Sequence, residues 1–213
     1  MDPWLVNLCH AQGAYAEIDY QQAQDPEALG YELTANGWCL GMAIQWLIQN
    51  SQRSNIWDFD SRGRLRLRPE VTPAIRFIMA RQGVIHKQFW GDAASQIDKA
   101  MLKGGLKPAN KVERLNQRYT PVGIFTAVKS MTGPYTVLQI YWGGTMQRQT
   151  AGHAVAFLMT GSRLGFMDPN FGEFTFDSMD KMLRWFNAFM LRTYPLNGGG
   201  QSFCLSSYTK AQA

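Results

Sequence analysis

The chain contains a cysteine, a histidine and an aspartate whose side chains could together support nucleophilic catalysis. Their positions in the sequence allow the three side chains to lie close together in the fold. His153 and Asp168 lie in two apolar runs separated by Thr160-Gly161-Ser162, a pattern typical of a two-stranded hairpin. A loop at Thr160-Gly161 would place His153 directly opposite Asp168. A loop at Gly161-Ser162 would leave them diagonal on the same face of the sheet. In either register the carboxylate can orient the imidazole.

An imidazole held by a carboxylate can act as a general base, and Cys39 is the nucleophile best placed to use it. Cys39 follows Asn36-Gly37-Trp38 and opens an apolar run with helical spacing that continues to Ile48. A helix start and a neighbouring imidazolium both favour a thiolate. Cys9 and Cys204 have no such setting, so we expect Cys39 to react much faster. The predicted catalytic residues are therefore Cys39, His153 and Asp168.

The segments around these residues carry a family resemblance. Residues 37–41, 152–156 and 168–174 resemble three motifs of the YopT-like effector cysteine peptidases, a family of bacterial effectors, in the same Cys, His, Asp order. The most specific is Asp168-Pro169-Asn170-Phe171-Gly172-Glu173. The resemblance spans roughly residues 34 to 176. It implies an α+β, papain-like fold, in which a nucleophile helix packs on a central antiparallel sheet carrying His and Asp. It also implies peptide-bond hydrolysis inside a target cell.

The composition suits one globular domain over residues 1–213, in which residues 1–33 form an N-terminal extension outside the motifs. The chain is 46% hydrophobic, and no apolar run approaches the roughly 20 residues of a membrane span. Met1-Asp2-Pro3-Trp4 has an acid where a signal peptide would have lysines. We therefore expect a protein that is cytoplasmic in its producer, and the family resemblance implies that it is secreted without a signal peptide. Three widely spaced cysteines favour free thiols, and we expect no metal and no cofactor.

The net charge of +5 conceals an uneven distribution. Residues 1–50 contain six acids and no Lys or Arg, whereas residues 51–120 contain fourteen Lys or Arg against six acids. The sharpest basic feature is the alternation of Arg62, Arg64, Arg66 and Arg68, which predicts four guanidinium groups on one strand face. They could dock an acidic protein, phosphates or an anionic membrane, or form a solvated edge strand. Nucleic acid is not expected, because no aromatic residues interleave with the stripe.

The remaining pattern predicts the elements around the hairpin. Strands are expected at 122–128 and 135–142, beside the His153 hairpin, and at 203–208, where Cys204 would be buried. Helices are expected at about 69–82, 92–102 and 178–192.

A nucleophilic cysteine with a histidine base and an orienting aspartate predicts a thiol protease, although other reactions use the same three residue types. Cys39 would attack a peptide carbonyl, and the oxyanion would be held by the Cys39 backbone N–H with Asn36 as the candidate side chain. The same residues could instead serve acyl transfer or glutamine deamidation, as in transglutaminases, deamidases and arylamine acetyltransferases. A binding protein with a vestigial triad is the alternative outside enzymes.

The resemblance to effectors bears on partners. It implies a protein substrate in a target cell and suggests type III secretion into a eukaryotic host, with a secretion chaperone as a possible partner. An antibacterial toxin delivered by type VI secretion is equally open, and it would need a cognate immunity protein over the Cys39 cleft.

Overall fold

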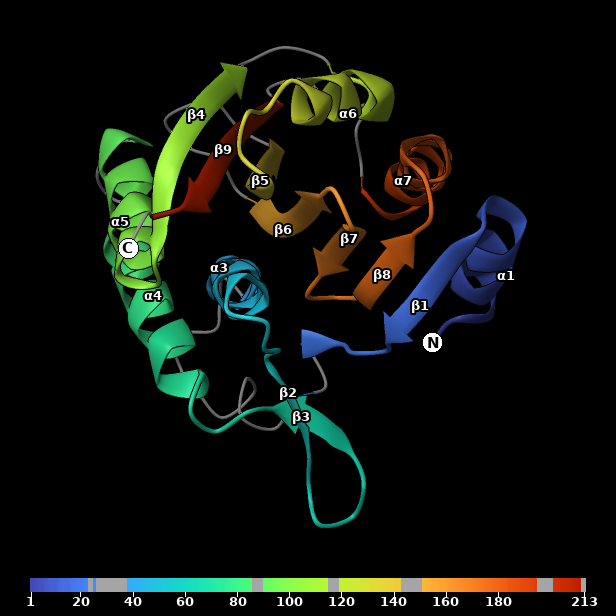
Figure 1. The fold of residues 1–213 in the computed structure, drawn as a ribbon, viewed down its shortest axis with the longest axis horizontal. Coiled ribbons are helices and arrows are strands. Elements are labelled where there is room, and N and C mark those ends of the chain that lie inside the picture. The colour runs from blue at the N-terminus through green and yellow to red at the C-terminus, as the bar shows by residue number, and fades with distance from the viewer. Residues whose placement is uncertain are drawn as a thin grey trace.

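The computed structural model describes residues 1–22, 25, 38–85, 90–114, 119–142, 151–194 and 201–211. Its centre is a curved antiparallel sheet of seven strands in the order β1-β8-β7-β6-β5-β9-β4 (Figure 1). These strands are β1 (Ala14–Ile18), β4 (Leu106–Arg114), β5 (Tyr135–Trp142), β6 (Ala151–Thr160), β7 (Arg163–Asp168), β8 (Gly172–Phe176) and β9 (Ser202–Lys210). A separate two-stranded hairpin pairs β2 (Trp57–Phe59) with β3 (Leu65–Leu67).

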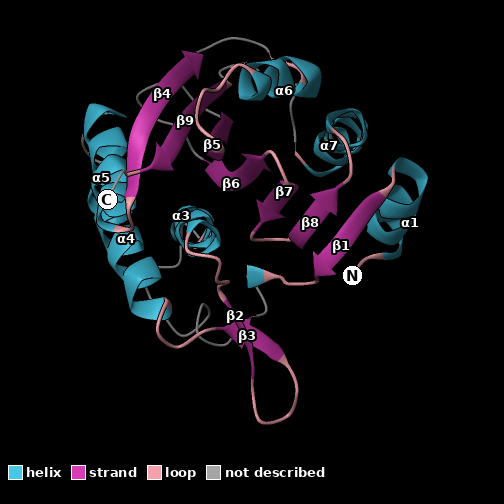
Figure 2. Cartoon of the chain, viewed as in Figure 1, coloured by secondary structure: helices cyan, strands magenta, loops and turns pink. Residues whose placement is uncertain are grey.

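Helices cover both faces of the sheet, as Figure 2 shows. On one face lie α3 (Cys39–Ser51), α4 (Thr72–Ile85) and α5 (Trp90–Lys103); on the other lie α1 (Pro3–Gln12), α6 (Pro121–Lys129) and α7 (Met179–Thr193). Because strand side chains alternate, β6 supplies both cores. Ala154, Ala156 and Leu158 face the α3 side, while Val155 and Phe157 face the α7 side. This is the predicted α+β arrangement, with the Cys39 helix packed on the sheet.

The hairpin that carries His153 and Asp168 has the second of the two expected registers. Thr160 pairs with Arg163 and Ala156 pairs with Met167, so the loop is Gly161-Ser162. In this register His153 and Asp168 are diagonal neighbours, as the shifted loop requires. Strand β5 pairs with β6 and with β9, which confirms the strands predicted at 135–142 and 203–208.

The strand predicted at 122–128 is wrong, because this segment forms helix α6. Its β-branched residues resemble a strand locally, but Pro121 occupies the first turn and Thr120 caps the helix. The Thr120 hydroxyl accepts a hydrogen bond from the Gly123 backbone N–H at 3.0 Å. The buried residues Ile124, Phe125 and Val128 follow helical spacing.

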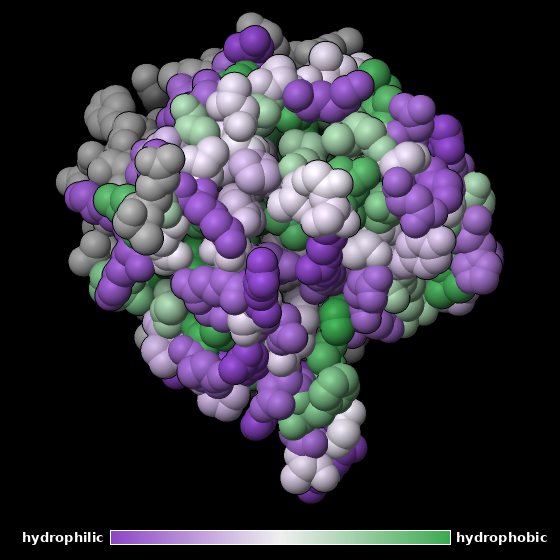
Figure 3. Space-filling model, viewed as in Figure 1, coloured by the Kyte–Doolittle hydropathy of each residue, from purple (hydrophilic) through white to green (hydrophobic). Residues whose placement is uncertain are grey.

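The predicted arginine face is also wrong. Strand β3 covers only Leu65–Leu67, so Arg66 is the one arginine of the stripe within it. Arg64 forms an ion pair with Asp60, Arg66 with Asp58 and Arg68 with Glu70. The β2–β3 hairpin projects from the body of the molecule in Figure 3, which suits the solvated interpretation of the stripe.

The other helix predictions are confirmed within a few residues at each end, as α4, α5 and α7. No described helix is both long enough and apolar enough to span a bilayer. The N-terminal extension supplies α1 and β1, and β1 completes one edge of the sheet beside β8.

Candidate active site

Cys39 is the first residue of α3, and the start of this helix is buried. Trp38 precedes it as the N-cap, and its carbonyl accepts the backbone N–H of Met42 at 2.9 Å. All residues from Cys39 to Ile48 are buried, because the helix lies between the sheet and α4. Gly41 permits this close packing, since a side-chain carbon there would lie 2.9 Å from Ile75. The predicted placement of the thiol at a helix start is confirmed.

His153 lies beside both of its expected partners. Its Nε2 lies 2.8 Å from Asp168 Oδ1, and the Cys39 side chain is close enough to help raise the pKa of the imidazole. Since Asp168 is bonded to Nε2, the remaining nitrogen, Nδ1, is the one available to the thiol. The structure therefore brings together the three residues that the sequence singled out.

Asp168 is fully buried, and three donors converge on its carboxylate. Besides His153, the backbone N–H of Asn170 donates to Oδ1 at 2.9 Å, and the Tyr194 hydroxyl donates to Oδ2 at 2.6 Å. The Tyr194 ring also stacks on the imidazole, with centroids 5.2 Å apart. A buried carboxylate with this many donors is held in one orientation. Tyr194 was not predicted, because it follows the last helix with no local motif.

The electrostatics of the site favour a charged imidazole. Burial alone lowers the pKa of His153, but the negative charge and hydrogen bond of Asp168, together with Cys39, raise it to about 10. Burial and the same carboxylate raise the pKa of Tyr194 well above its usual value, so its hydroxyl remains a donor. By contrast, burial raises the pKa of the Cys204 thiol to about 11, and burial also raises the pKa of Cys9.

The turn after Asp168 explains the most specific motif. The Asp168 side chain bonds the N–H two residues on, as in an Asx turn, and Gly172 ends the turn with φ +105°. A side-chain carbon at Gly172 would lie 1.9 Å from the carbonyl oxygen of Ile18 on β1. Glycine is therefore required both by the backbone conformation and by the neighbouring strand.

Glu173 of this motif has a structural contact on each side. Its buried carboxylate accepts from Trp57 Nε1 at 3.0 Å and from Arg163 Nη2 at 2.7 Å. These bonds attach β8 to the β2–β3 hairpin and to the start of β7, so the residue holds the scaffold around the site.

Gly152, immediately before His153, leaves space for the aromatic ring of Tyr141. It pairs across the strands with Tyr141 of β5, and a side-chain carbon there would lie 2.8 Å from the Tyr141 ring. The Tyr141 hydroxyl accepts a hydrogen bond from Gln139 Nε2 at 2.7 Å. The Gly-His pair thus lets the tyrosine ring lie beside the catalytic candidate.

The other predicted site residues are not part of this cluster. Asn36, the candidate oxyanion donor, lies outside the described residues. The arginines of the stripe belong to the β2–β3 hairpin and its flanks and are not among the partners of His153 or Asp168. Among the described residues, no group of three His, Cys, Asp or Glu side chains could hold a metal ion.

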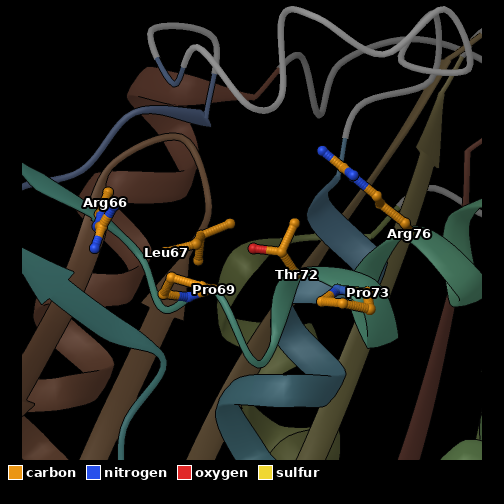
Figure 4. A pocket seen from close by; sticks show the side chains of 6 residues that line it. All are labelled: Arg66, Leu67, Pro69, Thr72, Pro73 and Arg76. Atoms are coloured by element: carbon orange, nitrogen blue, oxygen red, sulfur yellow. The ribbon is translucent and has the colours of Figure 1, made fainter. Parts of the chain in front are cut away.

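A small pocket lies where β3 meets the start of α4 (Figure 4). Its volume of about 160 Å³ suits a single side chain and is below the range of small-molecule sites. The guanidinium of Arg76 lies 5.9 Å from the centre of the Trp38 ring, so one wall adjoins the residue before Cys39. The lining residues are Arg66, Leu67, Pro69, Thr72, Pro73 and Arg76.

A peptidase family model matches most of the chain. Residues 12–211 match the model of the family described as Yersinia/Haemophilus virulence surface antigen, and the chain belongs to that family. The chain is 25% identical over 213 residues to the cysteine protease yopT1 of Yersinia enterocolitica serotype O:8 / biotype 1B. That alignment covers 90% of this chain and 64% of the relative, so the chain spans somewhat less than two thirds of the length of that protein.

A solved structure supports the fold assignment. The Pseudomonas avirulence protein AvrPphB superposes with a TM-score of 0.51 at 15% identity, over 83% of this chain and 94% of that one. At this identity the likeness concerns the fold, and it agrees with the papain-like arrangement that the motifs implied.

Proposed function

We propose that the chain is a cysteine endopeptidase in which Cys39 is the nucleophile, His153 the acid and base, and Asp168 the group that orients His153. The observation that carries the proposal is that the Cys39 thiol at the start of α3, the His153 imidazole and the buried Asp168 carboxylate lie together in one site, with His153 bonded to Asp168. Family membership supports the same reaction class. A merely structural histidine would not need a thiol on one side and a buried carboxylate on the other.

Acylation follows from this geometry. The Cys39 thiolate attacks the carbonyl carbon of the peptide bond and forms a tetrahedral oxyanion. The His153 imidazolium then gives its proton to the leaving nitrogen, the C–N bond breaks, and a thioester to Cys39 remains. The Cys39 backbone N–H at the helix start is a candidate donor to the oxyanion, and Asn36 stays the candidate side chain.

Deacylation reverses the proton transfers. Neutral His153 takes a proton from water as the hydroxide attacks the thioester. Cys39 leaves as a thiolate, and the product is a carboxylic acid. Asp168 stabilises the imidazolium in both steps and keeps Nδ1 facing the sulfur.

Mass spectrometry of a treated proteome tests the proposal. Wild-type protein should create new peptide N-termini that Cys39→Ala does not create, and His153→Ala and Asp168→Ala should behave like Cys39→Ala while remaining folded. Cleavage by folded Cys39→Ala would reject the mechanism. Conversion of glutamine to glutamate without new N-termini would instead identify a deamidase, the alternative use of the same residues.

We further propose that the substrate is a protein in a target cell, because the family is described as a virulence surface antigen and a relative is named a cysteine protease. Expression of the wild type in a bacterial cytosol, with Cys39→Ala as the control, separates the two delivery hypotheses. Growth arrest that depends on Cys39 supports an antibacterial toxin with an immunity protein. Normal growth with confirmed activity rejects it and leaves a host effector delivered by type III secretion.

The arginine stripe remains a proposed contact for an acidic partner. Three of its arginines already lie in ion pairs, so their contribution is expected to be small. Replacing Arg62 and Arg64 by Glu should weaken capture of an acidic partner, and unchanged capture would reject the contact.

A further inference from the structure

Gln22 lies between β1 and α3 and bonds to both sides of the candidate site. Its backbone N–H donates to the Pro169 carbonyl at 2.9 Å. Its side-chain Nε2 donates to Asn170 Oδ1 at 2.6 Å, and its Oε1 accepts the Trp38 backbone N–H at 2.9 Å. The carboxamide thus uses its donor and its acceptor to join two segments that are far apart in the sequence.

Its two partners lead to opposite ends of the Cys, His, Asp cluster. Trp38 is the N-cap of α3, and Cys39 is the next residue. Asn170 donates its backbone N–H to Asp168 Oδ1, and the Tyr194 hydroxyl donates to the other oxygen of the same carboxylate.

These contacts form one directed chain of hydrogen bonds. The Trp38 N–H donates to Gln22, the Gln22 side chain donates to Asn170, and the Asn170 backbone N–H donates to Asp168. The Trp38 N–H can only donate, so it fixes the side-chain oxygen of Gln22 on its own side. The chain therefore connects the nucleophile helix to the carboxylate by a path that does not pass through His153.

We propose that Gln22 is a positioning residue, whose carboxamide sets the start of α3 relative to Asp168 and so holds Cys39 in contact with His153. The inference deepens the proposed peptidase function and rests on it. Among common side chains, glutamine and asparagine offer an adjacent donor and acceptor, and the shorter asparagine would not span the same gap. Misplacement of a nucleophile by about 1 Å can reduce a rate by about 100-fold.

The test measures two quantities in each variant, the reactivity of the Cys39 thiol and the rate of substrate cleavage. In Gln22→Ala and Gln22→Glu, the rate of Cys39 alkylation by iodoacetamide is measured from about pH 5 to about pH 9 by site-resolved mass spectrometry. Glutamate keeps the acceptor for Trp38 but loses the donor to Asn170. We expect both variants to need a higher pH than wild type for half-maximal alkylation, and kcat to fall at least about tenfold while KM changes little.

Controls separate positioning from general damage. Gln52→Ala removes a glutamine at the other end of α3, where its Nε2 donates to the Gly104 carbonyl at 3.3 Å, and it should change neither readout. A folded Gln22→Glu protein with the wild-type alkylation profile and kcat would overturn the proposal.

Different results would reject the peptidase mechanism and the positioning role of Gln22. If Cys39→Ala still cleaves substrate, the peptidase mechanism fails whatever Gln22 does. If cleavage requires Cys39 but Gln22→Ala and Gln22→Glu behave as wild type, only the positioning role fails. The alkylation measurement needs no substrate, so it can be read before a target protein is known.

Discussion

Asp168 determines how the individual side chains of the site are arranged. Its oxygens accept from an imidazole, a backbone N–H and a phenol, and none of its surface is exposed. The buried negative charge favours the protonated form of His153. In the proposed mechanism the protonated ring stabilises a thiolate at Cys39, so the reactivity of the cysteine would depend on a carboxylate that need not contact the sulfur.

The charge on His153 predicts the alkaline limit of activity. The protonated ring must supply a proton to the leaving amine, so activity is lost as pH rises through the pKa of His153. That pKa is raised to about 10, and kcat/KM should therefore fall near pH 10 and not near the ordinary histidine value of about 6.5. A pH–rate profile measures it, with His10→Gln as a control that leaves the profile unchanged. A fall centred near pH 6.5 would contradict the role of Asp168.

Replacement of Asp168 distinguishes orientation from charge. In Asp168→Asn the amide oxygen can still accept from His153 and Asn170, and the Tyr194 hydroxyl can rotate to accept from the amide nitrogen. In Asp168→Ala all three donors lose their partner. We expect Asp168→Asn to retain at least about tenfold more activity than Asp168→Ala in a cleavage assay. Equal loss in both, with both folded, would show that only the charge matters.

At the scale of the elements, the turn between β7 and β8 places Asp168. Gly172 has a positive φ and lies against the backbone of Ile18, so the turn and the edge strand β1 fit together only with glycine. The same turn presents the Pro169 carbonyl and the Asn170 side chain to Gln22. One short motif therefore joins three segments of the chain.

The Gly172→Ala variant tests this fit. A methyl group 1.9 Å from the Ile18 carbonyl oxygen must displace β1, and φ of +105° is itself strained for alanine. We expect the free energy of unfolding to fall by about 3 kcal/mol in urea titrations. Gly161→Ala is the matched control, because an added carbon there meets nothing within 4 Å and should cost under about 1 kcal/mol. Similar losses in both variants would contradict the account of the turn.

The elements also show what sequence patterns can and cannot reveal. His153 and Asp168 were placed together because strand alternation and a short loop are local rules, and Cys39 because the helix periodicity begins there. The segment 122–128 was misassigned because Val122, Ile124 and Val128 favour strands, while the cap at Thr120 and the packing against α7 decided for a helix. Gln22 and Tyr194 contact Asn170 and Asp168 over long sequence separations, and no local pattern indicates such contacts.

At the scale of the whole molecule, the N-terminal segment is part of the fold. Strand β1 closes one edge of the seven-stranded sheet, and α1 packs on α7, where Trp4 stacks on Phe189 with centroids 6.2 Å apart. The family match begins at residue 12 and so includes β1. The site lies where this completed sheet meets the start of α3.

Removal of residues 1–19 should therefore damage stability and activity together. The edge of β8 would be exposed, and Gln22 would lose its covalent connection to β1. Thermal unfolding should shift down by several degrees or more, and the cleavage rate should fall with it. Tyr15→Ala, at an exposed position of β1, should leave both nearly unchanged. Full activity and an unchanged melting temperature in the truncated protein would contradict this role.

The central claim is that the His153–Asp168 pair activates Cys39, and alkylation of the three cysteines tests it most directly. Wild-type protein, His153→Ala and Asp168→Ala are treated with iodoacetamide at neutral pH, and modification of each cysteine is followed by mass spectrometry. In the wild type Cys39 should react at least about 100-fold faster than Cys9 or Cys204, and in folded His153→Ala this advantage should be lost. Equal rates at all three cysteines, or a fast Cys39 in folded His153→Ala, would contradict the account.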